Sequence, residues 1–475
     1  MEIQKSMEEV LELQKNHFLK EGPPSYDLRI DRLNRVQDVV IQNKKRITEA
    51  LNTDFGSRSP NQSLISDVYG VLPAFSHAKK YLKSWMKDEK RKSNFPSGLM
   101  GAKSFIHREP LGVVGMISPW NFPMYLSLAP LAGIFSAGNQ VMHKPSEFTP
   151  CTSKLLKEIC DKAFDETEFS TFLGGPDVGA AFTHLKFDHL LFTGSGNIGK
   201  HVMRAASENL VPLTLELGGK SPVIVSDSSN IDITARRVMF NKTLNAGQIC
   251  LAPDYVYVHE TEKDNFVDAC KIQVNKFYTD LKYNPDYTSV INQKHYDRLN
   301  GLLSDAKDRG AELVEINPAN EDFTQQESHK IPPTLVLNPT DDMQIMKEEI
   351  FGPLLPIKTY KDIDEPITYI NKHDKPLGLY YFGNNKNEEA AVVNSTSSGG
   401  VTINDIMGHI QQNELGFGGV GPSGMGKYDG FDGFMNFSNN KPIYKQIGFR
   451  LDKFFNAIRP PYKDSFEKVI QKLLK

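Results

Sequence analysis

The sequence predicts an α/β protein built on a doubly wound parallel sheet, and three observations lead to this fold class. Between residues 112 and 225, apolar strand-like runs alternate with helical patterns, which is typical of successive βαβ units. A second alternation of strands and helices follows, from about residue 220 to about residue 400. The chain has 475 residues, which is more than one domain usually contains. We therefore expect two α/β units in one chain.

The elements can be assigned in order along the chain. Residues 1–90 are expected to be helical, because charged and apolar side chains recur there at helical spacing. A turn signal at residues 94–98 precedes residues 103–109, which alternate like a strand. In the first alternation, strands are predicted at 112–117, 140–143, 189–192, 213–216 and 223–225, with helices near 123–137, 150–164 and 197–208. In the second, helices are predicted near 231–245 and 262–279, with strands at 254–258, 333–337 and 355–359.

The C-terminal part carries a glycine-rich segment and two apolar stripes. Residues 405–440 look loop-like, apart from a strand-like run at 434–438. We expect the two stripes behind this segment to pack against this subunit or a partner subunit. A basic helix on a membrane surface is the alternative, which acidic Asp464 and Glu467 disfavour because they dilute the charge of the lysines. The stripes have helical spacing and consist of Ile447, Leu451, Phe454, Phe455 and Ile458, and of Phe466, Val469, Ile470, Leu473 and Leu474.

Composition and charge exclude several classes of function. The chain is 39% hydrophobic and 24% charged, as is ordinary for a globular protein. Its net charge of −3 gives no electrostatic footprint for nucleic acid, so no nucleic-acid partner is expected. The four cysteines fit neither a disulfide framework nor a zinc motif, and no metal site is expected. Reduced thiols in the cytoplasm are the simplest interpretation.

No membrane span is expected. The charged N-terminus lacks the apolar core of a signal peptide. Residues 112–142 carry no charged side chain and are long enough to span a bilayer. Prolines and glycines interrupt this stretch, however, and it divides into strand, turn and helix. We expect it to be buried α/β core.

A glycine-rich turn follows the strand predicted at 189–192. Residues 194–199 read GSGNIG and open a helix, so Gly194, Ser195, Gly196 and Gly199 are candidates for aiming a helix N-terminus at a pyrophosphate. A dinucleotide site of this kind would place an acidic ribose ligand further along the chain. Glu216 is close enough to be that ligand, but it could equally be a general base or a solvated carboxylate at a strand end.

Cys250 is the candidate nucleophile. It lies in a loop-like run, NAGQICLAPD at residues 245–254, whereas Cys151, Cys160 and Cys270 lie in helical patterns typical of buried structural cysteines. A thiol and a carboxylate in glycine-containing loops are what thioester chemistry needs. Nucleophilicity would require a lowered pKa of the thiol or a nearby base.

Five ordered motifs together resemble the aldehyde dehydrogenase superfamily over roughly residues 25–445. They are PWNFP at 119–123, HKPSE at 143–147, ELGGKSP at 216–222, the Cys250 segment and EEIFGP at 348–353. Residues 248–255 and 417–426 look like the class 3 branch, and within it the chain is most similar to coniferyl aldehyde dehydrogenases.

This resemblance implies a particular fold. A Rossmann-like, doubly wound NAD(P)-binding domain is expected beside an α/β catalytic domain and a small β oligomerisation arm, which is the aldehyde dehydrogenase fold. The expected ranges are 1–93 and 113–217 for the NAD(P)-binding domain, 218–405 for the catalytic domain, 94–112 and 430–446 for the arm, 406–429 for a glycine-rich connection and 447–475 for a C-terminal helical tail.

The resemblance also implies roles for individual residues. The catalytic group would be Cys250 as nucleophile, Asn121 as oxyanion donor and Glu216 as the base that activates water. Lys144 and Glu147 would hold the adenosine ribose, which frees Glu216 from that role. The remaining candidates for cofactor binding are Trp120, Glu349 on the nicotinamide ribose, Phe351 beside the nicotinamide, and Gly194, Ser195, Gly196 and Gly199.

The implied reaction is oxidation of a small-molecule aldehyde to the acid with NAD, through a thiohemiacetal and a thioester. NADP remains possible, although Glu147 would repel a 2′-phosphate. An aromatic, coniferyl-like aldehyde and a homodimer are expected by analogy. The alternatives are a CoA-acylating dehydrogenase, against which Glu216 argues because such enzymes generally lack the base, and a thiol esterase on the same fold.

Overall fold

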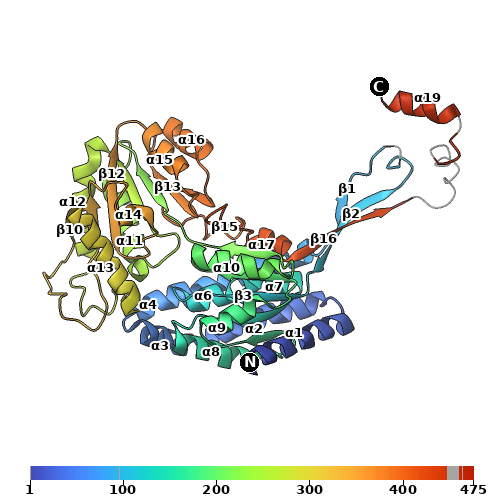
Figure 1. Ribbon diagram of the computed structural model, residues 1–475, viewed down its shortest axis with the longest axis horizontal. Helices are drawn as coiled ribbons and strands as arrows, with labels where there is room; N and C mark the ends of the chain where they lie inside the picture. The colour runs from blue at the N-terminus through green and yellow to red at the C-terminus, as the bar shows by residue number, and fades with distance from the viewer. Residues whose placement is uncertain (1, 96, 447–458, 463, 475) are drawn as a thin grey trace.

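The computed structural model describes residues 2–95, 97–446, 459–462 and 464–474. Figure 1 shows a lower body, a second lobe above it on the left, and an arm that extends to the upper right. The body contains the first sheet, the lobe contains the second sheet, and a three-stranded ribbon forms the arm. The expected α/β fold with two sheets is confirmed.

The first sheet has six strands in the order β15-β7-β6-β3-β4-β5, and all its pairs are parallel except the pair of β15 with β7. Its register aligns the carboxyl ends of the strands, since Ile117 pairs with both Lys144 and Phe192, and Thr193 pairs with Glu216. In open α/β sheets, ligands bind at this edge. The strands are β3 Val113–Ile117, β4 Gln140–Lys144, β5 Phe169–Thr171, β6 His189–Thr193, β7 Leu213–Glu216 and β15 Gly424–Met425.

Helices cover both faces of this sheet. Their ends follow ordinary capping chemistry: Ser25 accepts a hydrogen bond from Leu28 N at the start of α2, and Gly56 takes a left-handed conformation after α3. The helix predicted near 123–137 is two helices, which Pro130 separates. The helices are α1 Glu2–Glu21, α2 Tyr26–Gln42, α3 Lys44–Phe55, α4 Pro60–Ser63, α5 Leu72–Trp85, α6 Pro123–Leu128, α7 Leu131–Ala137, α8 Pro150–Ala163, α9 Pro176–Thr183 and α10 Gly196–Ser207, with a π turn at Leu64–Val68 and a 3-10 turn at Tyr69–Val71.

The second sheet has seven strands in the order β10-β11-β12-β9-β8-β13-β14. The run at 223–225, which ended the first predicted alternation, belongs to this sheet as β8, because it pairs with Tyr255–Val258 and with β13. The strands are β8 Pro222–Val225, β9 Tyr255–His259, β10 Glu312–Glu315, β11 Thr334–Leu337, β12 Leu354–Tyr360, β13 Gly378–Phe382 and β14 Gly400–Ile403. The helices are α11 Ile231–Thr243, α12 Lys263–Phe277, α13 Gln293–Asp308, α14 Gln344–Lys347, α15 Asp364–Lys372 and α16 Lys386–Ser395, with 3-10 turns at Leu244–Gly247 and Glu260–Glu262.

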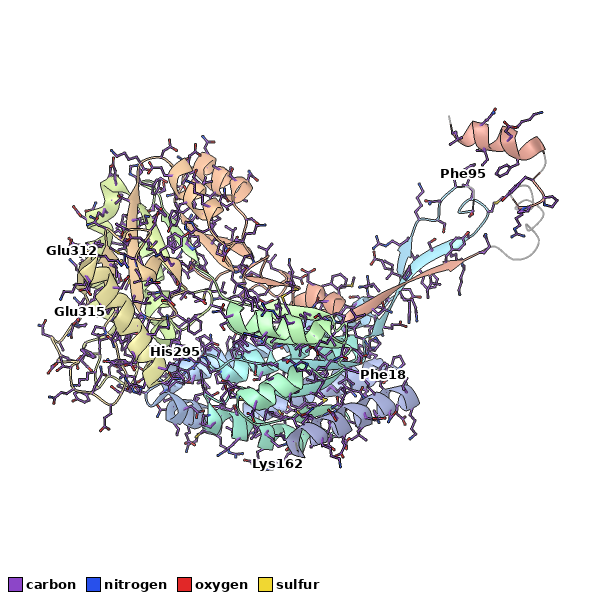
Figure 2. The ribbon with its side chains drawn as sticks, viewed as in Figure 1. Phe18, Phe95, Lys162, His295, Glu312 and Glu315 are labelled. Atoms are coloured by element: carbon purple, nitrogen blue, oxygen red, sulfur yellow. The ribbon has the colours of Figure 1, made fainter. Side chains whose placement is uncertain are left out.

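The arm consists of β1 Glu89–Arg91, β2 Lys103–Pro110 and β16 Ser438–Lys445, in the order β1-β2-β16. The strand expected at 434–438 was wrong for residues 434–437: helix α17, Gly430–Asn436, ends with Phe437 as its C-cap residue, and the strand begins only at Ser438. That helix packs on α7, where a Cβ atom at Gly133 would lie only 3.0 Å from the Tyr428 carbonyl oxygen and 3.2 Å from the carbonyl carbon of Gly433. Figure 2 shows Phe95 at the far end of the arm, and its side chain is 77% exposed.

The two C-terminal stripes remain predictions. The first, from Ile447 to Ile458, lies outside the described residues. The second coincides with helix α19, Asp464–Leu473, which lies beyond the arm and away from the body.

The uncharged stretch 112–142 is buried core, as expected. It forms β3, α6, α7 and the start of β4, all of which belong to the lower body. Among the helices of the described ranges, none combines the length and the apolar character that crossing a membrane requires.

Candidate active site

Cys250 lies in an irregular loop between α11 and β9. The loop begins with three left-handed residues, Asn245 at φ 50°, Ala246 at φ 51° and Gly247 at φ 71°. A side chain at Gly247 would collide with the carbonyl of Gly352, so glycine is required there for close approach of the backbone. Left-handed backbone at Asn245 and Ala246 persists only when the surroundings hold it.

Side chains rather than a sheet hold this loop in place. Asn121 Nδ2 donates to the Gln248 carbonyl over 3.1 Å. Tyr380 Oη donates to the Leu251 carbonyl over 2.7 Å. These donors come from distant parts of the sequence, so the position of the thiol depends on the tertiary structure.

The surroundings of Cys250 disfavour the ionised form of its thiol. Its pKa is raised to about 12, chiefly by burial and then by the carboxyl groups of Glu349 and Glu216, while its own N–H and that of Leu251 act in the opposite direction. A lowered pKa is therefore not what activates this thiol in the absence of ligands. The alternative requirement was a nearby base, and the carboxyl group of Glu216 interacts electrostatically with the thiol but raises its pKa. Of the other cysteines, Cys160 and Cys270 are buried as expected, but Cys151 is exposed, so its structural reading was wrong.

Glu216 ends β7 and is 3% exposed, which rules out a solvated carboxylate at a strand end. Neither of its carboxyl oxygens has a hydrogen-bond partner among the described residues. Burial raises its pKa well above the ordinary value, and the nearby carboxyl of Asp429 raises it further. A buried carboxyl group without a protein partner is free to bind a ligand or a water molecule.

Asn121 is fixed by its main chain as well as by its side chain. Arg58 Nη1 and Asn245 Nδ2 both donate to the Asn121 carbonyl, over 2.8 and 3.1 Å. The Asn121 amide uses one N–H on the Gln248 carbonyl, and an amide nitrogen carries two. One neutral donor thus remains beside the loop at residues 244–254, which we call the nucleophile loop after the candidate role of Cys250.

Lys144 and Glu147 lie at the carboxyl end of β4. The side chain of Lys144 is buried, and its Nζ lies 2.8 Å from Oε2 of the more exposed Glu147. Helix α9 lies beside the lysine, and Gly179 leaves space for the aliphatic part of the Lys144 side chain. An amine and a carboxylate beside each other at this edge can bind a ribose diol from two sides.

The glycine-rich turn opens α10 as predicted. Ser195 is the N-cap residue, and the helix begins at Gly196, around which a side chain would meet open space. Gly199 instead packs closely on Leu217, where a side chain would collide. Gly194 N donates to the Glu216 carbonyl over 3.0 Å, which joins the turn to β7.

A second group of candidates gathers where the two lobes meet. The rings of Trp120 and Phe351 lie 5.4 Å apart, and His295 lies 5.3 Å from Trp120. Figure 2 shows His295 at the end of α13 that faces the body. Glu349 lies against Gly218, and its pKa is raised to about 8, chiefly by burial and secondly by Asp254. Its Oε1 is buried and has no partner among the described residues.

Several residues at this site were not predicted to have a role. Lys220 Nζ pairs with Asp254 and donates to the carbonyls of Ile345 and Glu348, over 2.8 and 2.9 Å. It thereby ties together the segments after Glu216, after Cys250 and before Phe351. Lys220 and Asp254 stand inside the quoted motifs, which was their only signal in the sequence.

Asp429 is another such residue. It is buried, lies just before α17, and interacts electrostatically with Glu216. Burial raises the pKa of its carboxyl to about 7. No local pattern in the sequence pointed to it.

Across the described part of the chain, no group of three or more histidine, cysteine or acidic residues could hold a metal ion.

The comparisons with known proteins agree with this geometry. The family profile described as "Aldehyde dehydrogenase family" matches residues 22–443. A probable coniferyl aldehyde dehydrogenase of Caulobacter vibrioides is 52% identical over 466 residues, covering 98% of this chain and 96% of that protein. The coniferyl aldehyde dehydrogenase of a Pseudomonas species is 47% identical, covering 98% and 95%. The solved structure of Staphylococcus aureus AldH in a substrate-bound state is 38% identical with a TM-score of 0.91, and 99% of each chain is covered.

Fold and comparisons together define an oxidoreductase that acts on aldehydes. More particularly, the chain belongs to the aldehyde dehydrogenase family and is an aldehyde dehydrogenase. The resemblance to the class 3 branch and to coniferyl aldehyde dehydrogenases is confirmed, since members of both match along nearly the whole chain.

Proposed function

We propose that this enzyme oxidises an aldehyde to its carboxylic acid with NAD, using Cys250 as nucleophile and Glu216 as general base. The observation that carries the proposal is a half-buried thiol that interacts electrostatically with a buried carboxyl group, whose oxygens both lack partners among the described residues. The two groups interact electrostatically although they are far apart in sequence.

The residues present fit a dinucleotide. Lys144 and Glu147 offer ribose contacts at the carboxyl end of β4, and the open N-terminus of α10 at Gly196 suits a pyrophosphate. The unpartnered Oε1 of Glu349 can accept a hydrogen bond from the second ribose, beside the ring of Phe351. When bound, the nicotinamide supplies the acceptor for the hydride of the aldehyde.

In the acylation step, the Cys250 thiol loses its proton to solvent, its sulfur bonds to the carbonyl carbon, and the carbonyl electron pair moves to the oxygen as an oxyanion. When the oxyanion re-forms the C=O bond, the carbon would give its hydride to a bound nicotinamide, and a thioester to Cys250 would remain. The free N–H of Asn121 and the backbone N–H of Cys250 are the donors available for this oxyanion. Since burial and two carboxyl groups oppose ionisation of the thiol, a positive charge on a bound ligand would favour it.

In the deacylation step, Glu216 takes a proton from a water molecule, which attacks the thioester and releases the acid. The raised pKa of Glu216 makes it a stronger base once it is ionised. Because the sequence has Glu216, and both of its carboxyl oxygens lack partners among the described residues, we favour hydrolysis over transfer of the acyl group to CoA. Esterase activity of the thiol would be a side reaction.

For the substrate, we propose an aromatic aldehyde resembling coniferyl aldehyde, on the strength of the names of the curated relatives.

We further propose the domain division expected from the sequence, a homodimer and a cytoplasmic location. Support for the dimer comes from Phe95 and Leu99, which are 77% and 84% exposed on the arm. Apolar side chains exposed to this degree suit burial against a partner.

The decisive experiment replaces the nucleophile. Cys250→Ala should abolish NADH formation from an aldehyde and NAD, while the matched Cys151→Ala variant should keep normal turnover, because Cys151 lies on α8 outside the site. The assay is run with and without CoA, which separates hydrolysis from acyl transfer. Full activity of Cys250→Ala would refute the assignment.

A further inference from the structure

Lys242 is a buried lysine at the base of the nucleophile loop. It lies near the end of α11 with 1% of its surface exposed, and its Nζ donates to the Pro253 carbonyl over 2.7 Å. The chain between Lys242 and Pro253 contains Cys250. This hydrogen bond therefore joins the two ends of the loop that carries the thiol.

Because no sheet holds this loop, its conformation depends on side-chain hydrogen bonds of this kind. Its first part is strained at Asn245 and Ala246, and its middle is held by Asn121 and Tyr380. Lys242 supplies a third side-chain donor, which holds the far end. Burial of an amine costs free energy that one hydrogen bond to a carbonyl does not fully offset. A cost of this kind persists most readily where the group serves a site.

Lys242 also differs from the other two donors in its charge. Burial lowers its pKa to about 7; Asp254 and Glu349 favour the charged form, and Lys220 opposes it. Asn121 does not ionise, and the pKa of Tyr380 is well above its ordinary value. Of these three donors, Lys242 alone changes charge near neutral pH.

We propose that Lys242 is a positioning residue for the Cys250 thiol, which it fixes by tying the Pro253 carbonyl to the end of α11. The inference rests on the proposed role of Cys250 as nucleophile. In the ammonium form the bond is charge-assisted and hence stronger.

The test is the rate of the first turnover, measured as the burst of NADH in the full-length enzyme. Lys242→Met should slow the burst by about 10²-fold, because small displacements of a reacting group have effects of this size. NAD affinity, measured by quenching of tryptophan fluorescence, should be unchanged. Lys242→Arg should restore most of the rate. Since arginine keeps its charge, its burst rate should rise more steeply through pH 7 than that of the wild-type enzyme.

Lys330 provides the matched control. It is 2% exposed and donates to the carbonyls of Leu281 and Asn284, over 3.1 and 2.7 Å, rather than to the nucleophile loop. Lys330→Met should lose stability but keep the burst rate. An unchanged burst in Lys242→Met, or an equal loss in Lys330→Met, would overturn the proposal. If Lys242→Met does not fold, parallel pH profiles of Lys242→Arg and wild type would overturn it. Activity of Cys250→Ala would instead refute the proposed function.

Discussion

Arg58 and Asp67 form an ion pair with an Nη2–Oδ2 distance of 2.6 Å, and neither side chain is exposed to solvent. The pair lies behind the turn that carries Asn121. Arg58 donates to the Asn121 carbonyl, and Asp67 Oδ1 accepts a hydrogen bond from Met124 N over 3.2 Å. Burial lowers the pKa of Arg58 and raises that of Asp67, so each charge depends on the other. The segment that carries Asn121, the proposed oxyanion donor, is thus held by a buried ion pair.

Breaking this pair should be costly. Arg58→Met leaves Asp67 buried without its partner, and we expect a loss of about 3–5 kcal/mol in the free energy of unfolding. The measurement is urea denaturation at neutral pH. The double variant Arg58→Met with Asp67→Leu should regain part of that stability, because no uncompensated charge remains. If the double variant is no more stable than the single one, the loss comes from packing instead.

Removal of the Asn121 amide should slow chemistry more than binding. Asn121→Ala removes the side-chain donor for the oxyanion, and kcat should fall by about 10²–10³-fold with a smaller change in KM. Steady-state kinetics with a range of aldehyde concentrations provide the measurement. Asn139→Ala is the control, because Asn139 is also buried but its amide bonds to Ile134 and Phe437. Normal kcat in Asn121→Ala would remove this residue from the catalytic group.

Glu216→Gln should separate the two halves of the reaction. Acylation does not require the carboxylate, so a burst of NADH should persist, while steady-state turnover should fall by about 10²–10⁴-fold for want of the general base. Stopped-flow absorbance resolves the burst from the slow phase. Normal steady-state turnover together with weakened NAD binding would return Glu216 to the role of ribose ligand.

Glu147 should influence the choice between NAD and NADP. A carboxylate beside the ribose repels a 2′-phosphate, so Glu147→Gln should lower the KM for NADP relative to the KM for NAD. Glu158→Gln is the control, since Glu158 lies on neighbouring α8 and pairs with Arg46 and Lys162. An equal change in the two KM values would show that Glu147 does not face the 2′ position.

Asp429 should make stability depend on pH. Its pKa is near 3.8 when unfolded and is raised to about 7 by burial, so the folded protein binds more protons between these values. Its contribution to stability is therefore fully present below pH 3.8 and is lost as the pH rises towards 7. Unfolding free energies at pH 5 and pH 8 should differ less in Asp429→Asn than in wild type. Exposed Asp432 provides the control, as Asp432→Asn should behave like wild type.

Local pattern sufficed for much of the fold and for the identity of the candidate residues. The run 189–199 predicted a strand, a glycine turn and a helix, and the structure has β6, Ser195 as N-cap and α10. Pattern failed at 434–436, because an apolar run of this length fits a strand or a buried helix, and packing against α7 decides for the helix. It also failed at Cys151, since helical spacing does not reveal which face is exposed.

The sequence by itself determined the two α/β units, the family and the residue types of the site, because strand and helix periods and motif spacings are local properties of the chain. Only the tertiary structure decided the states of those residues. The pKa of Cys250 and that of Glu216 are raised by burial, and burial is produced by segments distant in sequence. The loop that carries the thiol is likewise held by hydrogen bonds from residues distant in sequence, namely Asn121 in the body and Tyr380 in the second lobe.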